Sequence, residues 1–345
     1  MSQEMIAPSL DQSWIASLPQ MESLWSTPAF EAGYVTALTQ TGHMLVQGDD
    51  AATFLHNQLS NDVERLQQGE MRRAAYCTAK GRMLASLVYW KATDGITLQL
   101  PIELLPAIKK RLGMFILRAK VTITDISTEH VVFALGGKQA ADALSAWFPT
   151  LPPTENTTIS NEYGTLIRYH ADQAAPRYQW ICPSQHATTM WNALTKTLQA
   201  CDPNDWQLAE ISAGIPTITS RTQEKFVPQM INFELIGGVN FKKGCYPGQE
   251  IVARSQYLGK LKRRMSLASL PAVDLVEGTE IFKESDPTQP CGMIVNVAVS
   301  GQQRSLALIE MSLADQEGGG LRCGSAEGPP VTILPLPYEI TDITR

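Results

Sequence analysis

The sequence predicts an α+β fold that ends in a small β-barrel. Strand-like and helix-like patterns interleave about every 15–25 residues up to about residue 253. Neighbouring strand patterns are often separated by turn-length connections, which favours α+β units over a doubly wound parallel sheet. After Arg254 the pattern changes to short strands parted by Gly, Pro, Asp and Ser, which is typical of a closed or nearly closed barrel.

The first part of the chain carries alternating strand patterns and apolar helical patterns. The expected strands are residues 44–46, 73–78, 83–90, 96–100, 120–126, 131–135, 165–169 and 178–181. The expected helices are residues 54–66, 101–112, 138–148 and 187–201. Asp49 or Asp50 is placed to cap the first of these helices, Gly69 to end it, and Pro101 to begin the second. Residues 1–30 contain three prolines and little periodicity, so we expect a loose arm there.

The last part of the chain carries strand patterns and no convincing helix. The expected strands are residues 264–269, 280–282, 293–299, 305–310 and 331–334. Residues 315–330 form an expected loop, because Gly318-Gly319-Gly320 and Pro329-Pro330 interrupt the pattern. The expected domains are therefore an N-terminal arm (1–34), an α+β region (35–253) and a C-terminal β-barrel (254–345).

Composition excludes several classes of protein. Hydrophobic residues make up 44% of the chain and charged residues 18%, as in globular proteins. No apolar run approaches the roughly 18 residues of a membrane span, and the N-terminus lacks a secretion signal, so we expect a cytoplasmic protein without membrane contact. The six cysteines are widely spaced, with no C-x-x-C pair, which argues against a zinc site, iron–sulfur ligation by this chain alone or a disulfide scaffold. We expect no metal site, and a monomer.

Residues 242–264 form a basic island on an acidic chain. The island contains seven Lys and Arg residues and one Glu, a balance of +6, whereas the whole chain carries −6. Such a local excess indicates an anionic ligand or partner, and it is equally typical of a solvated strand and loop.

Within the island, Lys242-Lys243-Gly244-Cys245-Tyr246-Pro247-Gly248-Gln249-Glu250 is the stretch that most clearly predicts chemistry. Cations and a helix N-terminus stabilise a thiolate, so Cys245 is the cysteine expected to be reactive. Glycines on both sides allow close approach to a ligand. None of the five histidines lies near Cys245 in the sequence, which weakens the interpretation as a Cys–His hydrolase.

Two further places are candidate binding sites. Trp206 is expected at the first turn of a helix, where its indole could stack on a flat heterocycle or simply belong to the core. The turn Cys77-Thr78-Ala79-Lys80-Gly81-Arg82 could bind an anion or could be an ordinary exposed hairpin.

The motif formed by Lys243, Gly244, Cys245, Tyr246, Gly248, Gln249 and Glu250, with Arg254, resembles the signature of the YgfZ family. This family comprises folate-binding proteins associated with tRNA modification, related to the aminomethyltransferase (T-protein) of glycine cleavage. The order of other segments supports the resemblance, which covers about residues 35–340. These segments are Val46-x-Gly48-Asp49-Asp50, Gln58–Val63, Ala79–Arg82, Trp206–Pro216, Phe226–Gln229 with Asn232, and Pro335–Tyr338.

The resemblance implies two intertwined ferredoxin-like domains and a C-terminal barrel around a central channel. It implies tetrahydrofolate or a folate derivative as ligand, bound by Trp206, Lys243 and Arg254. It also implies a role in iron–sulfur enzyme assembly or repair and thereby in tRNA modification, with assembly factors or client enzymes as partners and tRNA contacted indirectly if at all. Cys245 would then be a redox-active or cluster-handling thiol, with other ligands supplied by a partner or by glutathione.

Three departures from the family pattern bear on this reading. Ala85-Ser86 stand where aminomethyltransferases have a catalytic Asp pair, so the acid–base group of that transfer is missing. Ser212 replaces a Glu that can bond a pterin, and Glu210 lies two residues earlier, about 200° round a helix. Thr41 is the nearest residue to a Trp that some relatives carry.

Two other functions stay open. A folate-dependent one-carbon (aminomethyl or methyl) transferase or demethylase would need a carboxylate from elsewhere, such as Asp49 or Glu250. A direct RNA-binding module has only the basic island in its favour.

Overall fold

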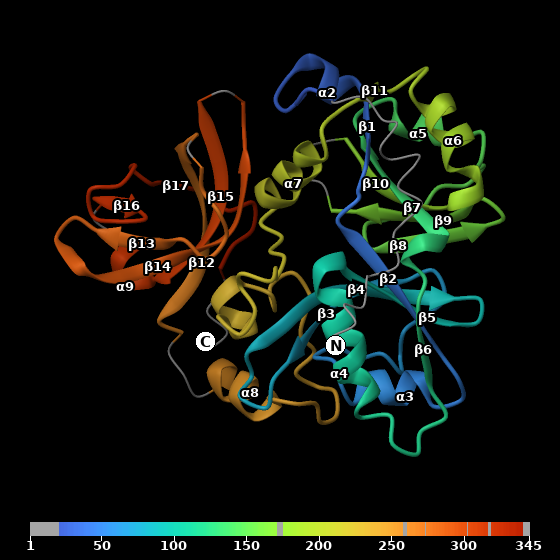
Figure 1. Ribbon diagram of the computed structural model, residues 1–345, viewed down its shortest axis with the longest axis horizontal. Coiled ribbons are helices and arrows are strands. Elements are labelled where there is room, and N and C mark those ends of the chain that lie inside the picture. The colour runs from blue at the N-terminus through green and yellow to red at the C-terminus, as the bar shows by residue number, and fades with distance from the viewer. Residues whose placement is uncertain are drawn as a thin grey trace, which may run out of the picture. The chain divides into compact units, whose positions relative to one another are not determined.

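The computed structural model describes residues 21–170, 175–257, 261–272, 274–301, 303–316 and 319–340. Three β-sheets and several helices make up the fold, which confirms the expected α+β class (Figure 1). The described residues up to Ala51, with Leu66–Met71 and Tyr89–Pro203, form one compact unit, and Ala52–Arg65, Arg72–Val88 and the chain from Asn204 form a second. The division into an arm, an α+β region and a barrel at residues 34 and 253 stays a prediction.

The first unit contains a six-stranded sheet of order β11-β1-β7-β10-β9-β8. Its strands are β1 (Tyr34–Ala37), β7 (His130–Gly136), β8 (Thr157–Asn161), β9 (Gly164–Tyr169), β10 (Arg177–Pro183) and β11 (Gln199–Ala200). All neighbours pair antiparallel except β1 and β11. The core of this unit gathers Phe133 and Trp180 from the sheet, Leu144 from α5 (Ala140–Leu144) and Trp191 from α6 (Ala187–Leu194).

A five-stranded sheet has the order β3-β4-β5-β2-β6. Its strands are β2 (Thr41–Gln47), β3 (Met71–Cys77), β4 (Met83–Ala92), β5 (Gly95–Pro101) and β6 (Thr122–Asp125). The remaining elements of the first unit are α2 (Pro28–Ala32), η1 (Ile102–Leu104), α4 (Leu105–Gly113), η2 (Ser127–Glu129) and η3 (Ser184–His186). Every strand expected from the sequence is present, although the first and last residues differ from the expected ones.

A structural repeat relates two parts of the first unit. β5 ends at Pro101 and continues through η1 into α4, just as β10 ends at Pro183 and continues through η3 into α6. The two prolines share nearly the same backbone angles, φ −55° and ψ 131° for Pro101 and φ −55° and ψ 132° for Pro183. The sequence shows this repeat only faintly, because the two segments share the fixed φ of proline and an apolar spacing rather than residue identities.

Three expected helices are shorter than the sequence indicates. The helix expected over residues 54–66 is α3 (Ala51–His56), those expected over 138–148 and 187–201 are α5 and α6, and the one expected over 101–112 is split into η1 and α4. After His56 the chain turns instead, because Ser60 N–H donates to Ala75 O and the side chains of Asn61 and Asp62 accept bonds from Asp62 N–H and Arg65 N–H. The apolar residues after His56 therefore reach the core from turns. Their spacing in the sequence nevertheless resembles that of a helix.

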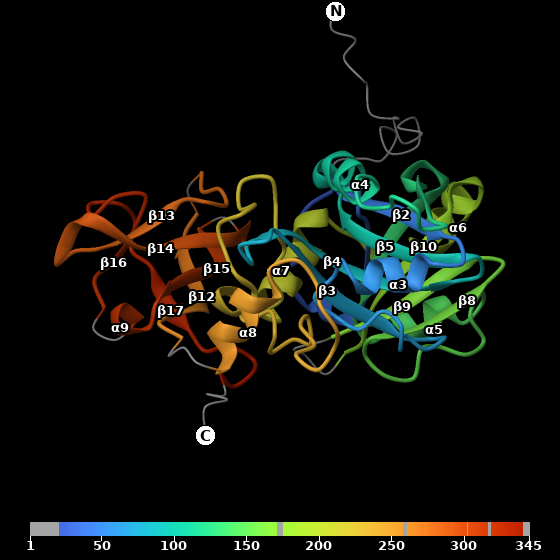
Figure 2. The same ribbon diagram turned by 90° about the horizontal axis from the view of Figure 1, so that it is seen from below.

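The second unit contains a six-stranded antiparallel sheet that curls into a half-barrel, as expected for the C-terminal part (Figures 1 and 2). Its order is β16-β13-β14-β15-β12-β17. The strands are β12 (Arg263–Pro271), β13 (Glu280–Lys283), β14 (Asp286–Val299), β15 (Arg304–Ser312), β16 (Leu321–Cys323) and β17 (Thr332–Leu334). A short helix, α9 (Leu313–Gln316), lies where no helix was expected.

The other helices of the second unit are α7 (Pro203–Ser212), η4 (Pro228–Ile231) and α8 (Gln249–Tyr257). Gln229 on η4 fixes α8, since its side-chain amide donates to Val252 O at 2.7 Å. Asn232, in a left-handed conformation at the end of η4, donates to Met265 O on β12 at 2.9 Å. This segment thus ties α8 to the half-barrel.

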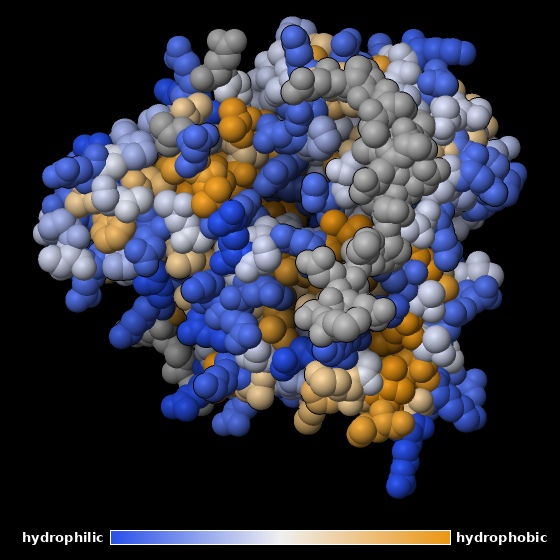
Figure 3. Space-filling model, in the orientation of Figure 1, coloured by the Kyte–Doolittle hydropathy of each residue, from blue (hydrophilic) through white to orange (hydrophobic). Residues whose placement is uncertain are grey.

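Hydrophilic side chains cover much of the face seen in Figure 3, and hydrophobic ones gather at the lower right, where Figure 1 has α3 and α4. In the loop after α4, Met114, Phe115 and Leu117 are exposed, Leu117 to 88%. In the part of the chain that the structure describes, no helix is both long and apolar enough to cross a membrane.

Candidate functional site around Cys245

Cys245 differs from the other five cysteines in its exposure to solvent. Its side chain is exposed, Cys291 is half-buried, and Cys77, Cys182, Cys201 and Cys323 are buried. Burial raises the pKa of Cys77 and of Cys182 to about 12, which keeps both as unreactive thiols at neutral pH. The structure therefore leaves Cys245 as the cysteine open to chemistry, on the turn that enters α8.

Gly248 locks this turn against the hairpin between β3 and β4. A Cβ atom at Gly248 would lie 2.4 Å from Thr78 O and 2.6 Å from Gly81 N, and Gly248 has φ +82°. Gly81 faces it with φ +73°, and a Cβ there would lie 3.3 Å from Gly248 O. The two sequence segments singled out, 77–82 and 243–250, are thus packed backbone to backbone, and only glycine permits that approach.

Lys243 holds the other side of the turn. Its side chain is buried, and Nζ donates to His56 O at 2.5 Å and to Leu59 O at 2.9 Å. These carbonyls belong to the C-terminal end of α3 and the turn after it, where a cation satisfies main-chain acceptors that the helix leaves open. Burial lowers the pKa of Lys243 to about 8, while Asp62, Cys245 and Glu64 oppose that shift. The sequence does not show that this lysine serves the backbone.

The remaining motif residues divide between support and surface. Tyr246 is buried, its ring lies beneath the Lys243 ammonium at 4.8 Å, and burial raises the pKa of its hydroxyl. Gln249 N–H donates to Tyr246 O at 3.1 Å, which starts α8 as expected. Glu250 and Arg254 are exposed on α8 and are available to a ligand or partner.

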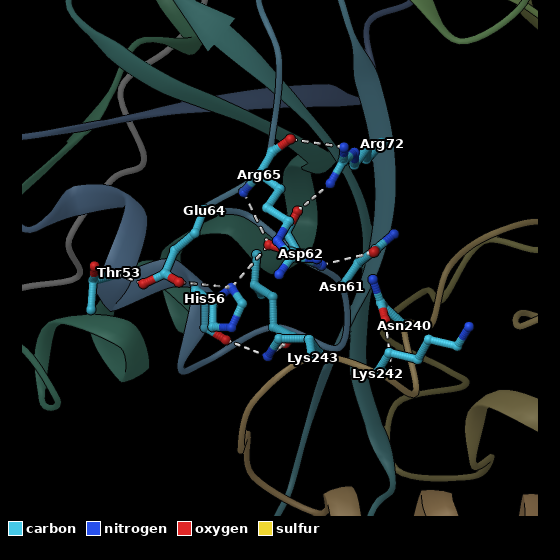
Figure 4. A network of polar contacts seen from close by, with 11 residues as sticks. Thr53, His56, Asn61, Asp62, Glu64, Arg65, Arg72, Asn240, Lys242 and Lys243 are labelled. Carbon is cyan, nitrogen blue, oxygen red and sulfur yellow. Dashed lines mark hydrogen bonds and ion pairs between the residues drawn. The ribbon is translucent and has the colours of Figure 1, made fainter.

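A histidine lies beside the motif although none is near it in the sequence. A Cβ atom at Gly244 would lie 3.6 Å from His56 Nε2. On the other side of the ring, His56 Nδ1 lies 3.2 Å from Asp62 Oδ1 and 4.0 Å from Glu64 Oε2, and Figure 4 shows the ring facing both carboxylates. Distance along the sequence, which weakened the Cys–His interpretation, does not carry over to the fold, because Lys243 of the motif is bonded to the main chain of His56, 187 residues away.

The other predicted site residues lie on elements of their own. Trp206 is in the first half of α7 and only 5% exposed. Ala85 is fully buried, and Ser86 is buried with its hydroxyl accepting the Ile218 N–H at 2.9 Å. The place of the transferase acids is therefore filled by a methyl group and by a hydroxyl committed to the backbone.

Two cations of the basic island, Lys243 and Arg264, are buried. Arg264 is buried on β12 in an ion pair with Glu234, and Arg263 pairs with Glu310. With Lys243 bound to carbonyls and Lys260 outside the described residues, the +6 balance overstates the charge this segment presents to solvent. The partners Glu234 and Glu310 are distant in the sequence, so sequence proximity gives no sign of them. Lys242, Arg254 and Lys262 stay exposed, and direct RNA binding rests on these three cations.

Comparison with known proteins adds an independent view of the chain. No protein-family model matches it. It is similar to the tRNA-modifying protein YgfZ of Colwellia psychrerythraea, with 32% identity over 251 residues that cover 73% of this chain and 75% of the relative. The YgfZ protein of Photorhabdus laumondii is 28% identical over 311 residues, which cover 89% of this chain and 92% of the relative. Among solved structures, the glycine cleavage system aminomethyltransferase T of Bartonella henselae matches with a TM-score of 0.73 at 14% identity, over 92% of this chain and 88% of that one, a likeness of fold.

Proposed function

Because the chain belongs to the YgfZ family of tRNA-modifying proteins, as its motif residues predicted, we propose that it acts in tRNA modification through the Cys245 thiol. The observation that carries this proposal is the exposure of Cys245 on a turn that is held from both sides. Gly248 packs on the β3–β4 hairpin, and Lys243 is bonded to the end of α3. A thiol fixed in this way is presented to a partner at little entropic cost.

The proposed chemistry is redox or sulfur-transfer work that supports iron–sulfur enzymes, the class that the family resemblance implies. Among the described residues, no three His, Cys, Asp or Glu side chains are grouped as metal ligands. A single cysteine supplies about one of the four ligands that a cluster usually has. Cys245 would therefore act on a client protein or assembly factor that holds the remaining ligands, and not as a resident cluster site.

Tetrahydrofolate or a folate derivative is the proposed ligand, on the strength of the family and of the aminomethyltransferase-like fold. Arg254 fits this role best, since its exposed guanidinium can pair with a folate glutamate tail. Stacking of folate on Trp206 stays a prediction. The Trp206 side chain is only 5% exposed in the structure, so one face of its indole would have to become accessible to the ligand. Lys243 already donates to two carbonyls, so its contribution to a folate anion would be long-range attraction. The arrangement of two ferredoxin-like domains and a barrel around a channel also stays a prediction.

The rival function, one-carbon transfer to or from folate, lacks a carboxylate at the position where aminomethyltransferases have their catalytic acids. The buried Ala85 and the bonded Ser86 offer no carboxylate at the family position. Glu250, exposed on α8, is the acid that a transferase would have to use instead. Turnover of methylene- or methyl-tetrahydrofolate with an amine donor, abolished by Glu250→Gln, would replace the present proposal with this one.

The deciding experiment compares strains that carry Cys245→Ala and Cys291→Ala. Cys291 is the matched control because it is half-buried and lies outside the motif, on β14. We expect loss of tRNA thiomethylation with Cys245→Ala and normal modification with Cys291→Ala, at equal protein levels. Normal modification in both strains would refute the proposal. Folate titration of the purified protein by tryptophan fluorescence, with Arg254→Ala for comparison, tests the ligand separately.

A further inference from the structure

We propose that His56, which lies beside Asp62 and Glu64, accepts the proton of the Cys245 thiol when that thiol reacts. The inference rests on the proposed function in that it takes Cys245 as the reactive group. It adds a base that no sequence pattern predicted.

The first support is the position of the imidazole. His56 is the last residue of α3, and its side chain is 11% exposed. Its Nε2 atom borders the main chain at Gly244, where an added Cβ would lie 3.6 Å away. Cys245 is the next residue, with its Cα about 3.8 Å further along the chain. Because position 244 has no side chain, the imidazole can lie against the main chain immediately before Cys245.

The second support is the pair of carboxylates on the opposite side of the ring. Asp62 Oδ1 lies 3.2 Å and Glu64 Oε2 4.0 Å from Nδ1 (Figure 4). A negative charge at this edge favours the tautomer with its proton on Nδ1, which leaves the lone pair on Nε2, toward the motif.

The carboxylates are themselves held in place. Asp62 Oδ1 accepts the Arg65 N–H at 3.0 Å, and the Arg65 guanidinium lies 3.8 Å from Asp62 Oδ2. Thr53 on α3 donates its hydroxyl to Glu64 at 2.9 Å. The two carboxylates are thus held by the turn after α3 and by α3 itself, and their positions do not depend on Cys245.

Lys243 is the other charge that faces this site. Its Nζ is bonded to the main-chain oxygen of His56, and the charge of Cys245 raises the pKa of Lys243 against the effect of burial. The cluster therefore holds an ammonium as well as the imidazole proposed to accept the proton.

The step can be written with small disulfides as the co-reactant. The Cys245 S–H bond breaks, its proton passes to His56 Nε2, and the sulfur attacks one sulfur of the disulfide. A mixed disulfide forms, the original S–S bond breaks, and the departing thiolate takes the proton from His56. With iodoacetamide the same attack forms a C–S bond and releases iodide, so alkylation reports the proton step without a second thiol.

The test measures the alkylation rate of Cys245 by iodoacetamide in the full chain at pH 7 and at pH 9, with Cys245→Ser identifying the site. For His56→Gln we expect a rate at pH 7 lower by about tenfold and at pH 9 by less than about twofold, since hydroxide replaces the base at high pH. His170→Gln is the matched control, because His170 also pairs with a carboxylate, Glu155 at 2.6 Å, on the surface of the other unit. Asp62→Asn keeps the acceptor for the Arg65 N–H and should give an intermediate loss at pH 7.

Added imidazole separates a proton-transfer role from a structural one. In His56→Gly, imidazole in the buffer should restore most of the rate at pH 7 and should not accelerate the parent. An equal loss at both pH values, an unchanged rate, or no rescue would overturn the proposal. A His56-independent rate together with lost tRNA modification in the Cys245→Ala strain would remove only this inference. Intact tRNA modification in that strain with a His56-dependent rate would remove only the proposed function.

Discussion

Substitution of Gly248 by alanine tests how the turn that carries Cys245 is held. Two separate effects should act on this variant. Gly248 has φ +82°, a region that costs an L-residue about 1–2 kcal/mol. Its new Cβ would also lie 2.4 Å from Thr78 O and 2.6 Å from Gly81 N, and crowding of this kind typically costs about 1–3 kcal/mol.

Gly237→Ala is the matched control, because it carries the first effect without the second. Gly237 has φ +77°, and nothing lies within 4 Å of a Cβ built there. We therefore expect Gly237→Ala to lose about 1–2 kcal/mol of stability and Gly248→Ala about 2–5 kcal/mol. The difference between the two isolates the packing of the motif on the β3–β4 hairpin.

Labelling of Cys77 provides the local readout. This thiol is buried next to Thr78, so it reacts only when the hairpin opens. In a Cys245→Ala, Cys291→Ala background, each 1.4 kcal/mol of lost local stability should raise the labelling rate about tenfold. Equal losses for the two glycine variants, or unchanged Cys77 labelling in Gly248→Ala, would show that the contact with the hairpin does not hold the turn.

Three further predictions concern stability. Burial lowers the pKa of His43 from 6.5 to about 4, so the unfolded chain binds a proton between these values that the folded chain does not, and about 3 kcal/mol should be lost as pH falls from 7 to 4. His43→Gln should remove most of this slope in urea titrations across pH, while His186→Gln, at a half-exposed site, should not. Arg264→Met should lose about 3–5 kcal/mol at pH 7, because it leaves the Glu234 carboxylate buried without its cation. Burial already raises the pKa of Glu234, so the loss should shrink in acid, and a loss that is constant with pH would contradict this account. Leu117, exposed at φ +46°, should gain about 1 kcal/mol from Leu117→Gly, with a higher urea midpoint, whereas Leu117→Val should lower it.

The strands were largely predictable because short apolar runs between turn residues mark them in a single sequence. The expected strands from 44–46 to 331–334 are all present, and several of them, such as β5 and β10, are buried on both faces. Helix lengths were less predictable. The spacing over residues 54–66 satisfies a helical pattern, yet Asn61 and Asp62 bond to their own backbone and end the helix at His56.

The charges of the site were the least predictable part. Lys243 and Arg264 look alike in the sequence, as cations near a reactive cysteine. In the fold, Lys243 is bonded to carbonyls of residues 56 and 59, and Arg264 is paired with Glu234 on a buried strand. Each partner is at least 30 residues away in the sequence, so no local pattern could have separated these roles.

These contacts change what the motif around Cys245 means physically. If the sequence pattern served the thiol alone, the lysine and the second glycine would need to face the sulfur. Instead, Gly248 is required by the backbone of Thr78 and Gly81, and Lys243 by the end of α3. Gly248 and Lys243 both fix the main chain around Cys245. The Lys243 ammonium is already bonded to carbonyls and does not act as a free cation for a ligand. The motif is therefore best understood as a clamp that joins α3, the β3–β4 hairpin and α8 and that leaves the Cys245 thiol exposed for chemistry.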